Sequence, residues 1–197
     1  MIHPATPGHH DEPALQPAYP ITTPRLTLRP FTLDDLDAVH AYESRPDVTR
    51  YLYWHPRDRD TSREALAKKA IRTAIHREGD GLDLAITLRG SGHLIGSALL
   101  IWTSREHRQG EIGYVLHPGH HGHGYATEAA REMLRLGFTG LHLHRITGRL
   151  DARNTASARV LTKLGMRHEA TLIDNEYVKG EWASEAVHAI LETEWTP

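Results

Sequence analysis

The sequence predicts one mixed α/β domain, and two observations predict it. The chain has 197 residues, of which 39% are hydrophobic and 24% charged, which suits one globular domain with a substantial core. Along the chain, segments in which apolar residues alternate with period two are interleaved with segments of helical period, as in domains that pack helices on a sheet. The formal net charge is −2, with both signs interspersed, so we expect neither nucleic acid nor a membrane as the partner.

The composition also predicts the cellular compartment. The chain contains no cysteine, which excludes disulfides, thiolate metal ligands and a thiol nucleophile. No apolar run approaches the roughly 20 residues of a membrane span. The first 20 residues are rich in Pro, Gly and His and lack the pattern of a secretory signal. We therefore expect a soluble cytoplasmic protein with a flexible arm at residues 1–20 and a single domain at residues 21–197.

The domain is expected to open with a strand and a helix. RLTLRPF, residues 25–31, alternates apolar and polar residues as a half-buried strand does. Thr32-Leu-Asp-Asp35 is close to a capping box and predicts a first helix that ends before Arg45-Pro46.

The segment 46–60 has no clear period. Its aromatic cluster YLYW, residues 51–54, is expected to pack around a short connecting helix, and lining a pocket is the alternative. A second capping box, Thr61-Ser-Arg-Glu64, predicts a second helix that is closed by Gly79-Asp80-Gly81.

Three strands and two strand-loop-helix units follow. Apolar residues at i, i+3, i+4 and i+7 predict an amphipathic helix over residues 126–138. The other predicted elements are strands at 83–89 and 93–102 joined by the Gly90-Ser91-Gly92 turn, strands at 111–117 and 144–151, a helix capped by Asn154 and stopped at Gly165, and strands at 166–173 and within 182–195.

The stretch HPGHHGHGYATE, residues 117–128, joins a strand to a helix and holds four histidines and three glycines. Its histidines form no HExxH pair on a helix, which argues against zinc. Tyr125 stands where a Walker loop needs lysine, and Thr127 stands where a dinucleotide fingerprint needs its third glycine. Two interpretations stay open: a loop whose backbone N–H groups hold a pyrophosphate at a helix N-terminus, or a plain glycine-rich turn.

His121-Gly-His-Gly124-Tyr-Ala126 resembles the Gln/Arg-x-x-Gly-x-Gly/Ala loop of the GCN5-related N-acetyltransferase (GNAT) superfamily. GYATEA, residues 124–129, resembles the form found in its ribosomal-protein N-terminal (RimJ/RimL-like) acetyltransferase subgroup. Four further segments agree in the same order: TPRLTLRPFTLDDLDAV, EIGYVL, NTASARVLTKLGM and AILETEW. The likeness covers roughly residues 21–195, and five motifs in one order are more specific than any one alone.

The resemblance implies the GNAT fold: a central mixed, mostly antiparallel twisted sheet of about seven strands, splayed at the cofactor-binding strand and flanked by about four helices. It implies acetyl-CoA as the cosubstrate and no metal. The pantetheine arm would pair with the open strand edge and bond to Asn154, while loop amides hold the pyrophosphate. His121 keeps the backbone donor but not the long side chain of Gln or Arg. The implied cofactor-binding residues are Tyr114, Val115, Leu116, His121, Gly122, His123, Gly124, Tyr125, Ala126, Asn154 and Ser157.

The implied enzyme is an N-acetyltransferase, an acyltransferase that needs a base for the amine and an acid for the CoA thiolate. Without cysteine, direct attack in a ternary complex is expected. The Tyr that many members use as the acid is Leu161 here, so Ser157, which resembles the serine that the subgroup keeps, is the expected acid; a first-turn helix serine is the alternative. Glu111 is the expected base, acting through water, and a strand-end carboxylate in an ion pair is the alternative. Tyr177 and His117 are reserve candidates.

Two other functions stay open. One is a catalytically silent CoA-binding or sensor module, which Leu161 favours; the other is a metal chaperone that uses His120, His121 and His123. The acceptor is expected to be a protein N-terminal α-amine or a small-molecule amine, and the acidic residues Asp174, Glu176 and Glu181 would attract a cationic amine or face water. A homodimer is a family-level expectation.

Overall fold

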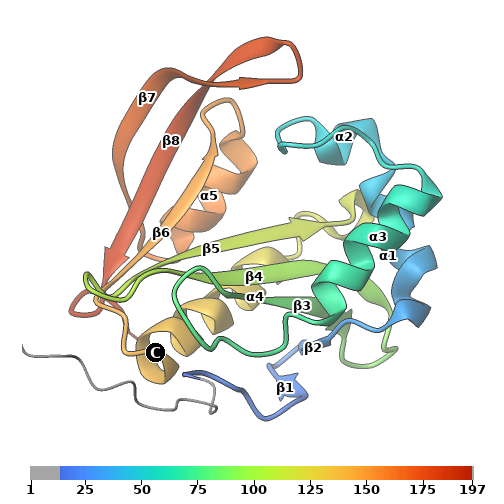
Figure 1. Ribbon diagram of the computed structural model, residues 1–197, viewed down its shortest axis with the longest axis horizontal. Helices are drawn as coiled ribbons and strands as arrows, with labels where there is room; N and C mark the ends of the chain where they lie inside the picture. The colour runs from blue at the N-terminus through green and yellow to red at the C-terminus, as the bar shows by residue number, and fades with distance from the viewer. Residues whose placement is uncertain (1–13, 197) are drawn as a thin grey trace, which may run out of the picture.

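The computed structural model describes residues 14–196 and shows one open, twisted sheet with helices on both faces (Figure 1). The eight strands run in the order β1-β2-β3-β4-β5-β6-β8-β7. Neighbouring strands are antiparallel except β5 and β6, which are parallel. The strands are β1 (Ile21–Thr22), β2 (Leu26–Pro30), β3 (Gly81–Leu88), β4 (Leu94–Ser104), β5 (Gln109–Leu116), β6 (Arg145–Asp151), β7 (Arg167–Val178) and β8 (Glu181–Leu191). The predicted mixed, mostly antiparallel sheet is confirmed, with one strand more than expected.

Helices cover the two faces of this sheet in separate groups (Figure 1). The helices α1 and α3 pack against β4 and β3 on one face, and α4 packs against β4 and β5 on the other, next to α5. None of the described helices is long and apolar enough to cross a membrane. The helical elements are η1 (Leu33–Asp35), α1 (Leu36–Glu43), α2 (Pro46–Thr49), α3 (Arg59–Ala70), η2 (Pro118–His120), α4 (Tyr125–Arg135), η3 (Leu136–Gly140) and α5 (Thr155–Lys163).

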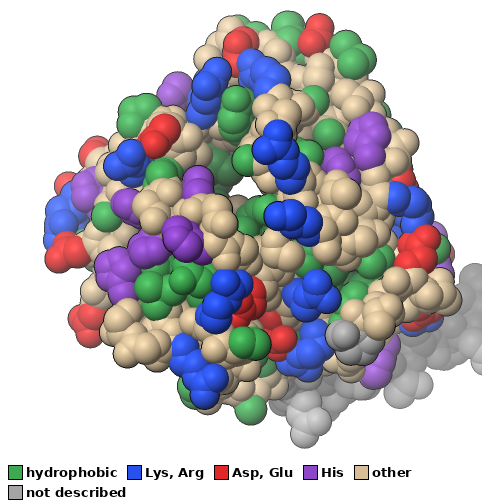
Figure 2. Space-filling view, turned by 180° about the vertical axis from the view of Figure 1, so that it is seen from behind, with side chains coloured by type: hydrophobic (Ala, Val, Ile, Leu, Met, Phe, Trp, Pro, Cys, Tyr) green, Lys and Arg blue, Asp and Glu red, His purple; other side chains and the backbone are tan. Residues whose placement is uncertain are grey.

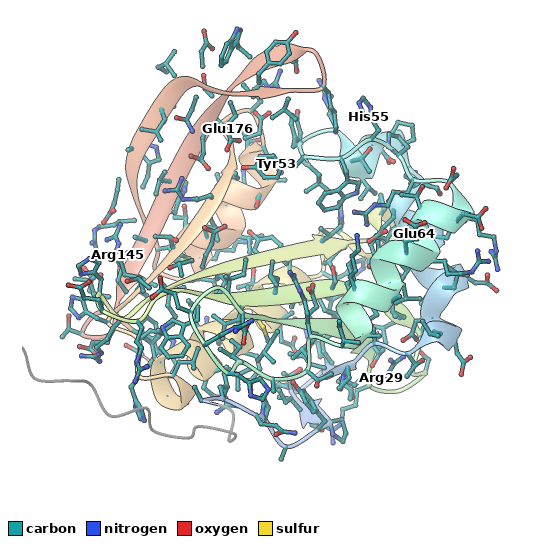
Figure 3. The ribbon with its side chains drawn as sticks, in the orientation of Figure 1. Arg29, Tyr53, His55, Glu64, Arg145 and Glu176 are labelled. Atoms are coloured by element: carbon teal, nitrogen blue, oxygen red, sulfur yellow. The ribbon has the colours of Figure 1, made fainter. Side chains whose placement is uncertain are left out.

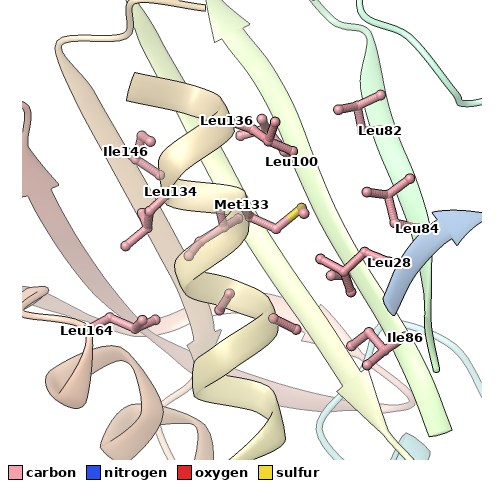
Figure 4. Close-up of a cluster of buried hydrophobic side chains, with 14 of the residues drawn as sticks. Leu28, Leu82, Leu84, Ile86, Leu100, Met133, Leu134, Leu136, Ile146 and Leu164 are labelled. Atoms are coloured by element: carbon pink, nitrogen blue, oxygen red, sulfur yellow. The ribbon is translucent and has the colours of Figure 1, made fainter. Parts of the chain in front are cut away.

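The main core lies between α4 and the sheet (Figure 4). Met133 and Leu134 on α4 are buried against sheet residues that include Leu100 and Ile146. The predicted amphipathic period of this helix is thereby confirmed, although the α-helix ends at Arg135 and continues as a π-helical turn that buries Phe138. Truncating a fully buried side chain such as Met133 to alanine is expected to cost about 2–5 kcal/mol.

The predicted first helix is confirmed, and the predicted second helix is wrong at both ends. Thr32 and Asp35 form the expected capping box. The helix α3 begins earlier than predicted, because Asp58 is its N-cap and accepts a hydrogen bond from the Thr61 backbone N–H at 2.8 Å. It ends at Ala70, since the chain returns to the core there: Ile75 is fully buried and forms a bridge with Leu15.

That bridge also corrects the predicted arm. Leu15 is buried, and its side chain fills the space beside Gly140, where a Cβ would lie 2.6 Å from Leu15 Cδ1. The Tyr19 hydroxyl donates to the Thr73 carbonyl at 2.8 Å. Residues 14–20 are therefore part of the domain, because an apolar and an aromatic side chain find partners on it. Residues 1–13 of the predicted arm lie outside the described residues.

The C-terminal strands also differ from their predicted lengths. The strand β7 runs on to Val178, beyond the predicted residue 173, because pairing with β8 resumes at Glu176↔Ala183 after an irregularity and continues to Val178↔Glu181. Lys179 and Gly180 then turn the chain, with φ angles of 53° and 87°. The strand β8 ends at Leu191, so residues 192–195 of the predicted final strand are not strand.

Candidate active site

The parallel strands β5 and β6 pair over only three residues and then separate. Their ladder begins at Gln109↔Arg145 and ends at Glu111↔Thr147. On its other edge β5 stays paired with β4 as far as Gly96↔Leu116. The splay predicted at Tyr114–Leu116 is therefore present, and it begins directly after Glu111.

The backbone of β5 presents polar groups to this splay. The His117 N–H donates to the Ile95 carbonyl on the β4 side at 2.8 Å. Because backbone groups alternate along a strand, those of Leu116 and Tyr114 point the other way, into the splay. The Leu116 carbonyl accepts a hydrogen bond from His121 Nε2 at 3.1 Å, and since a carbonyl only accepts, this ring nitrogen carries the proton. The His121 side chain thus closes the loop back onto the end of β5.

The glycine loop meets α4 in the geometry that an anion site needs. Gly122 and Gly124 both have φ of +80°, and Gly124 is the N-cap of α4. Only glycine adopts this left-handed backbone without strain. The loop amides and the positive end of the helix dipole are therefore available together, which fits a pyrophosphate.

Arg25 at the start of the domain braces this loop. Its guanidinium donates to the His123 carbonyl and to Glu128 Oε2, both at 2.7 Å. It also lies 4.9 Å from the centre of the Tyr125 ring, which stacks on His123. Burial raises the pKa of Glu128, but hydrogen bonds from Thr23 and Arg25 outweigh that effect and hold the pKa below its usual value. No local pattern in the sequence marks Arg25, because its partners are about a hundred residues away along the chain.

Across the splay, Tyr114 on β5 contacts Ser157 on α5. The Tyr114 hydroxyl lies 2.9 Å from Ser157 Oγ and 3.1 Å from the Ser157 carbonyl oxygen. Asn154 caps this helix as predicted, since its side-chain oxygen accepts from the Ser157 N–H at 3.1 Å. Burial raises the pKa of Tyr114 to about 12, so the phenol is neutral at physiological pH.

Leu161 occupies the position at which the resembled family often has a tyrosine. It is 2% exposed and packs on Gly148 of β6, where a Cβ would lie 2.8 Å from Leu161 Cδ1. Its side chain belongs to the core, and a leucine has no proton to donate, so the acid has to come from another residue.

Glu111 lies at the mouth of the splay in an acidic cluster. Its Oε2 is 3.7 Å from Arg149 Nε, and Arg149 Nη1 also donates to the buried Glu185 at 2.8 Å. Burial raises the pKa of Glu111; Arg149 opposes this effect, while Glu185 and Glu176 add to it. Glu111 is thus a carboxylate that accepts a proton more readily than an ordinary glutamate does.

A pocket of about 100 Å³ adjoins this cluster, between the segment 50–53 after α2, the end of β6 and the β7–β8 hairpin. Glu176 of the hairpin and Tyr53 from the segment after α2 lie close together there (Figure 3). Burial and the neighbouring Glu176 raise the pKa of Tyr53. For the YLYW cluster, the alternative of lining a pocket is therefore the correct one for Tyr51, Leu52 and Tyr53.

The reserve candidates lie elsewhere. Tyr177 is absent from the pocket lining and packs edge-on against Trp182 on the hairpin, since neighbouring strand residues face opposite ways. His117 lies six residues beyond Glu111, about 20 Å along an extended chain. Sequence reasoning missed Arg149 and Glu185. The available signal for Glu185 was a charged residue directly before AVHAIL, the mostly apolar second half of β8.

A group of histidines gathers on one side of a central opening, and other histidines lie on the opposite side (Figure 2). The rings of His93 and His117 lie 5.6 and 5.9 Å from that of His120. Partial burial, together with charged neighbours, lowers the pKa of His117 and of His120. Within residues 14–196, no three or more His, Asp or Glu side chains form a group that could hold a metal ion.

A sheet that splays beside a glycine-capped helix is the arrangement expected of a GNAT acetyltransferase, and comparison with known families gives the same class. The model of the acetyltransferase (GNAT) domain matches residues 25–167. The chain belongs to this family, whose members use acetyl-CoA, and the predicted GNAT fold is confirmed.

Three individual proteins show how similar this chain is to known acetyltransferases. The uncharacterized N-acetyltransferase YnaD of Bacillus subtilis is 36% identical over 176 residues, which cover 89% of this chain and 98% of YnaD. The crystal structure of a GNAT-family acetyltransferase from Bacillus anthracis superposes with a TM-score of 0.78 at 33% identity, covering 88% of this chain and 99% of that one. The spermidine N(1)-acetyltransferase of Escherichia coli K12 is 26% identical over 155 residues, 79% of this chain and 80% of that protein. None of these three relatives belongs by its description to the RimJ/RimL-like subgroup, which stays a prediction.

Proposed function

We propose that this protein transfers the acetyl group of acetyl-CoA to a primary amine by direct attack in a ternary complex. The observation that carries the proposal is the separation of β5 from β6 after Glu111↔Thr147, next to a loop in which Gly124 caps α4. An unpaired strand edge and a helix N-terminus are complementary to the two polar parts of CoA, its amide-bearing arm and its pyrophosphate.

The proposed cofactor contacts are mainly backbone contacts. The polar groups of Tyr114 and Leu116 would pair with the pantetheine amides, with Val115 between them packed against the α1–α3 side. Asn154 and Ser157 at the start of α5 would flank the arm. The amides of His121, Gly122, His123, Gly124, Tyr125 and Ala126 would hold the pyrophosphate.

Acetyl-CoA supplies an activated thioester, and the chain supplies a base and an acid. Glu111 would take a proton from the ammonium through water, which leaves the amine lone pair free to attack the thioester carbonyl. A C–N bond forms, the C–S bond breaks, and CoA leaves as the thiolate, which Ser157 Oγ–H would protonate. The nitrogen gives up its second proton to solvent as the amide forms, and the Ser157 oxygen takes a proton back from solvent. Tyr114 is a positioning residue in this scheme, because it holds the Ser157 hydroxyl at 2.9 Å.

The acceptor in this proposal is a protein N-terminal α-amine, as the RimJ/RimL-like resemblance implies, or a small-molecule amine. The relationship to a spermidine acetyltransferase supports an amine acceptor in general. A cytoplasmic location and a homodimer complete the proposal.

Calorimetric titration with acetyl-CoA tests it. The wild-type chain is expected to bind with micromolar affinity. Gly124→Glu should abolish binding, because it places a carboxylate where the pyrophosphate would lie and strains a backbone with φ of +80°. Gly79→Glu is the matched control: Gly79 has φ of +90° and open space around it, so it repeats the strain and the charge away from the loop. Absence of binding to the wild type, or equal loss in both variants, would contradict the proposal.

A further inference from the structure

The pocket beside Glu111 has an uneven distribution of charge. At one end the carboxylates of Glu176 and Glu185 line the pocket with the single cation Arg149, which pairs with Glu185. Just beyond the lining, Glu111 lies 3.7 Å from the same Arg149. This end carries an excess of negative charge, which suits a protonated amine that has to come close to Glu111.

The outer end has the opposite balance. Arg153 bonds Asp151 at 2.6 Å and Glu181 at 2.8 Å, so its charge is matched by two carboxylates. Arg50 and Lys179 line the same end, and among the ion pairs of residues 14–196 neither has a carboxylate partner. Two cations are thus left to face whatever enters the pocket.

Both cations are held in place. The guanidinium of Arg50 lies 5.1 Å from the centre of the Tyr51 ring. The guanidinium of Arg153, which is already paired with two carboxylates, lies 5.9 Å from the same ring. Lys179 Nζ donates to the Thr49 carbonyl, which joins the hairpin tip to the end of α2. A cation fixed in this way can still accept an anion as a second partner, since an ammonium has three donors.

We infer that the acceptor is a small zwitterion, an amino acid or dipeptide whose carboxylate lies against Arg50 and Lys179 while its amine faces Glu111. This inference rests on the proposed function and names the substrate class for the same site. Polyamines fit the pocket less well, because a second ammonium would lie against these two cations. The volume of about 100 Å³ and the Lys179 contact with Thr49 suit a small molecule rather than a long peptide.

Matched acceptor pairs test the inference on the full chain. Lysine and cadaverine differ only by the carboxylate, as do ornithine and putrescine, while alanylalanine and its C-terminal amide differ in the charge of that group. Initial rates of CoA release are measured, and the acetylated product is identified by mass spectrometry. In every pair that is acetylated, we expect kcat/KM for the member with the carboxylate to be at least tenfold higher than for the member without it.

Variants then connect this preference to the two cations. Arg50→Met combined with Lys179→Met should lower the carboxylate preference about tenfold, because the KM of lysine rises and the repulsion of the second ammonium of cadaverine is relieved. The charge-retaining pair Arg50→Lys and Lys179→Arg should restore the preference. Arg59→Met is the control, because Arg59 pairs with Asp37 outside the pocket lining.

The outcomes separate this inference from the proposed function. If acetyl-CoA binds and the carboxylate-free members are equal or better acceptors, or no member is acetylated, the zwitterion inference is overturned and the cofactor assignment stands. If the double Met variant keeps the preference for acceptors with a carboxylate, the role of Arg50 and Lys179 is overturned. If acetyl-CoA fails to bind the wild type, the proposed function and this inference both fall.

Discussion

The Tyr114 hydroxyl lies 2.9 Å from Ser157 Oγ, so a side chain of β5 reaches across the splay to the first turn of α5. Tyr114 is largely buried, and its pKa is raised to about 12. The neutral phenol therefore fixes the direction of the serine hydroxyl at the place where the two strands separate.

This contact predicts unequal effects of two substitutions. Ser157→Ala should lower kcat about 10²-fold, the lower end of the range for loss of a general acid. Tyr114→Phe should lower kcat about five- to tenfold, because it removes one hydrogen bond worth about 1 kcal/mol that orients the serine. Steady-state kinetics with saturating acetyl-CoA measure both effects.

Tyr177→Phe is the matched control, since it removes a phenol that is 65% exposed on the hairpin. It should leave kcat unchanged. If Tyr177→Phe lowered kcat as much as Ser157→Ala does, the assignment of Ser157 as the acid would be contradicted.

The acidic environment of Glu111 predicts the pH dependence. A base must be deprotonated to act, and burial raises the pKa of Glu111. Activity should therefore fall as pH drops through a value above that of an ordinary glutamate. Arg149→Met should move this acidic limb to higher pH, because Arg149 opposes the rise in pKa. Glu111→Gln should lower kcat/KM about 10²-fold and remove the limb. A limb that persists in Glu111→Gln would assign the base to another residue.

The brace from Arg25 predicts an effect on cofactor affinity. Arg25→Met removes the bonds to the His123 carbonyl and to Glu128, so the glycine loop loses an external support. We expect the Kd for acetyl-CoA to rise about fivefold, which corresponds to about 1 kcal/mol. Calorimetry measures this Kd. Arg63→Met is the control and should leave the Kd unchanged, because Arg63 pairs with Asp60 on α3, away from the loop. Equal affinity in the wild type and Arg25→Met would show that the loop holds its shape alone.

A buried ion cluster under α1 and α3 predicts a large stability effect. Glu43 is 1% exposed and accepts hydrogen bonds from Arg57 Nη1 and Lys69 Nζ, both at 2.6 Å. Glu43→Leu should lower the free energy of unfolding by about 3–5 kcal/mol, because two poorly solvated cations lose their counter-charge. Urea denaturation measures the loss. Asp60→Ala, at an exposed pair, should leave the unfolding midpoint unchanged, and a similar shift in both would contradict a special role for burial.

Much of the secondary structure could be predicted because its causes are local. The capping box at Thr32 and Asp35, the apolar period of α4 and the cap at Asn154 each depend on residues within about one or two helical turns. The start of α3 was misplaced because Asp58 and Thr61 are both good caps, and the choice between them depends on how the preceding segment approaches. The end of α3 was misplaced because Ile75 is drawn into the core by Leu15, sixty residues earlier.

The candidate site divides in the same way. The sequence by itself determined the glycine loop and the cap at Asn154, because each is a contiguous motif with its own local geometry. Ser157 and Glu111 became candidates through the family resemblance of the contiguous motifs that contain them. Only the tertiary structure decided that Tyr114 touches Ser157, that Arg25 braces the loop, and that Arg149, Glu176 and Glu185 surround Glu111. These contacts join residues that are far apart along the chain, and the sheet order that brings them together depends on burying the whole core at once, which no local pattern specifies.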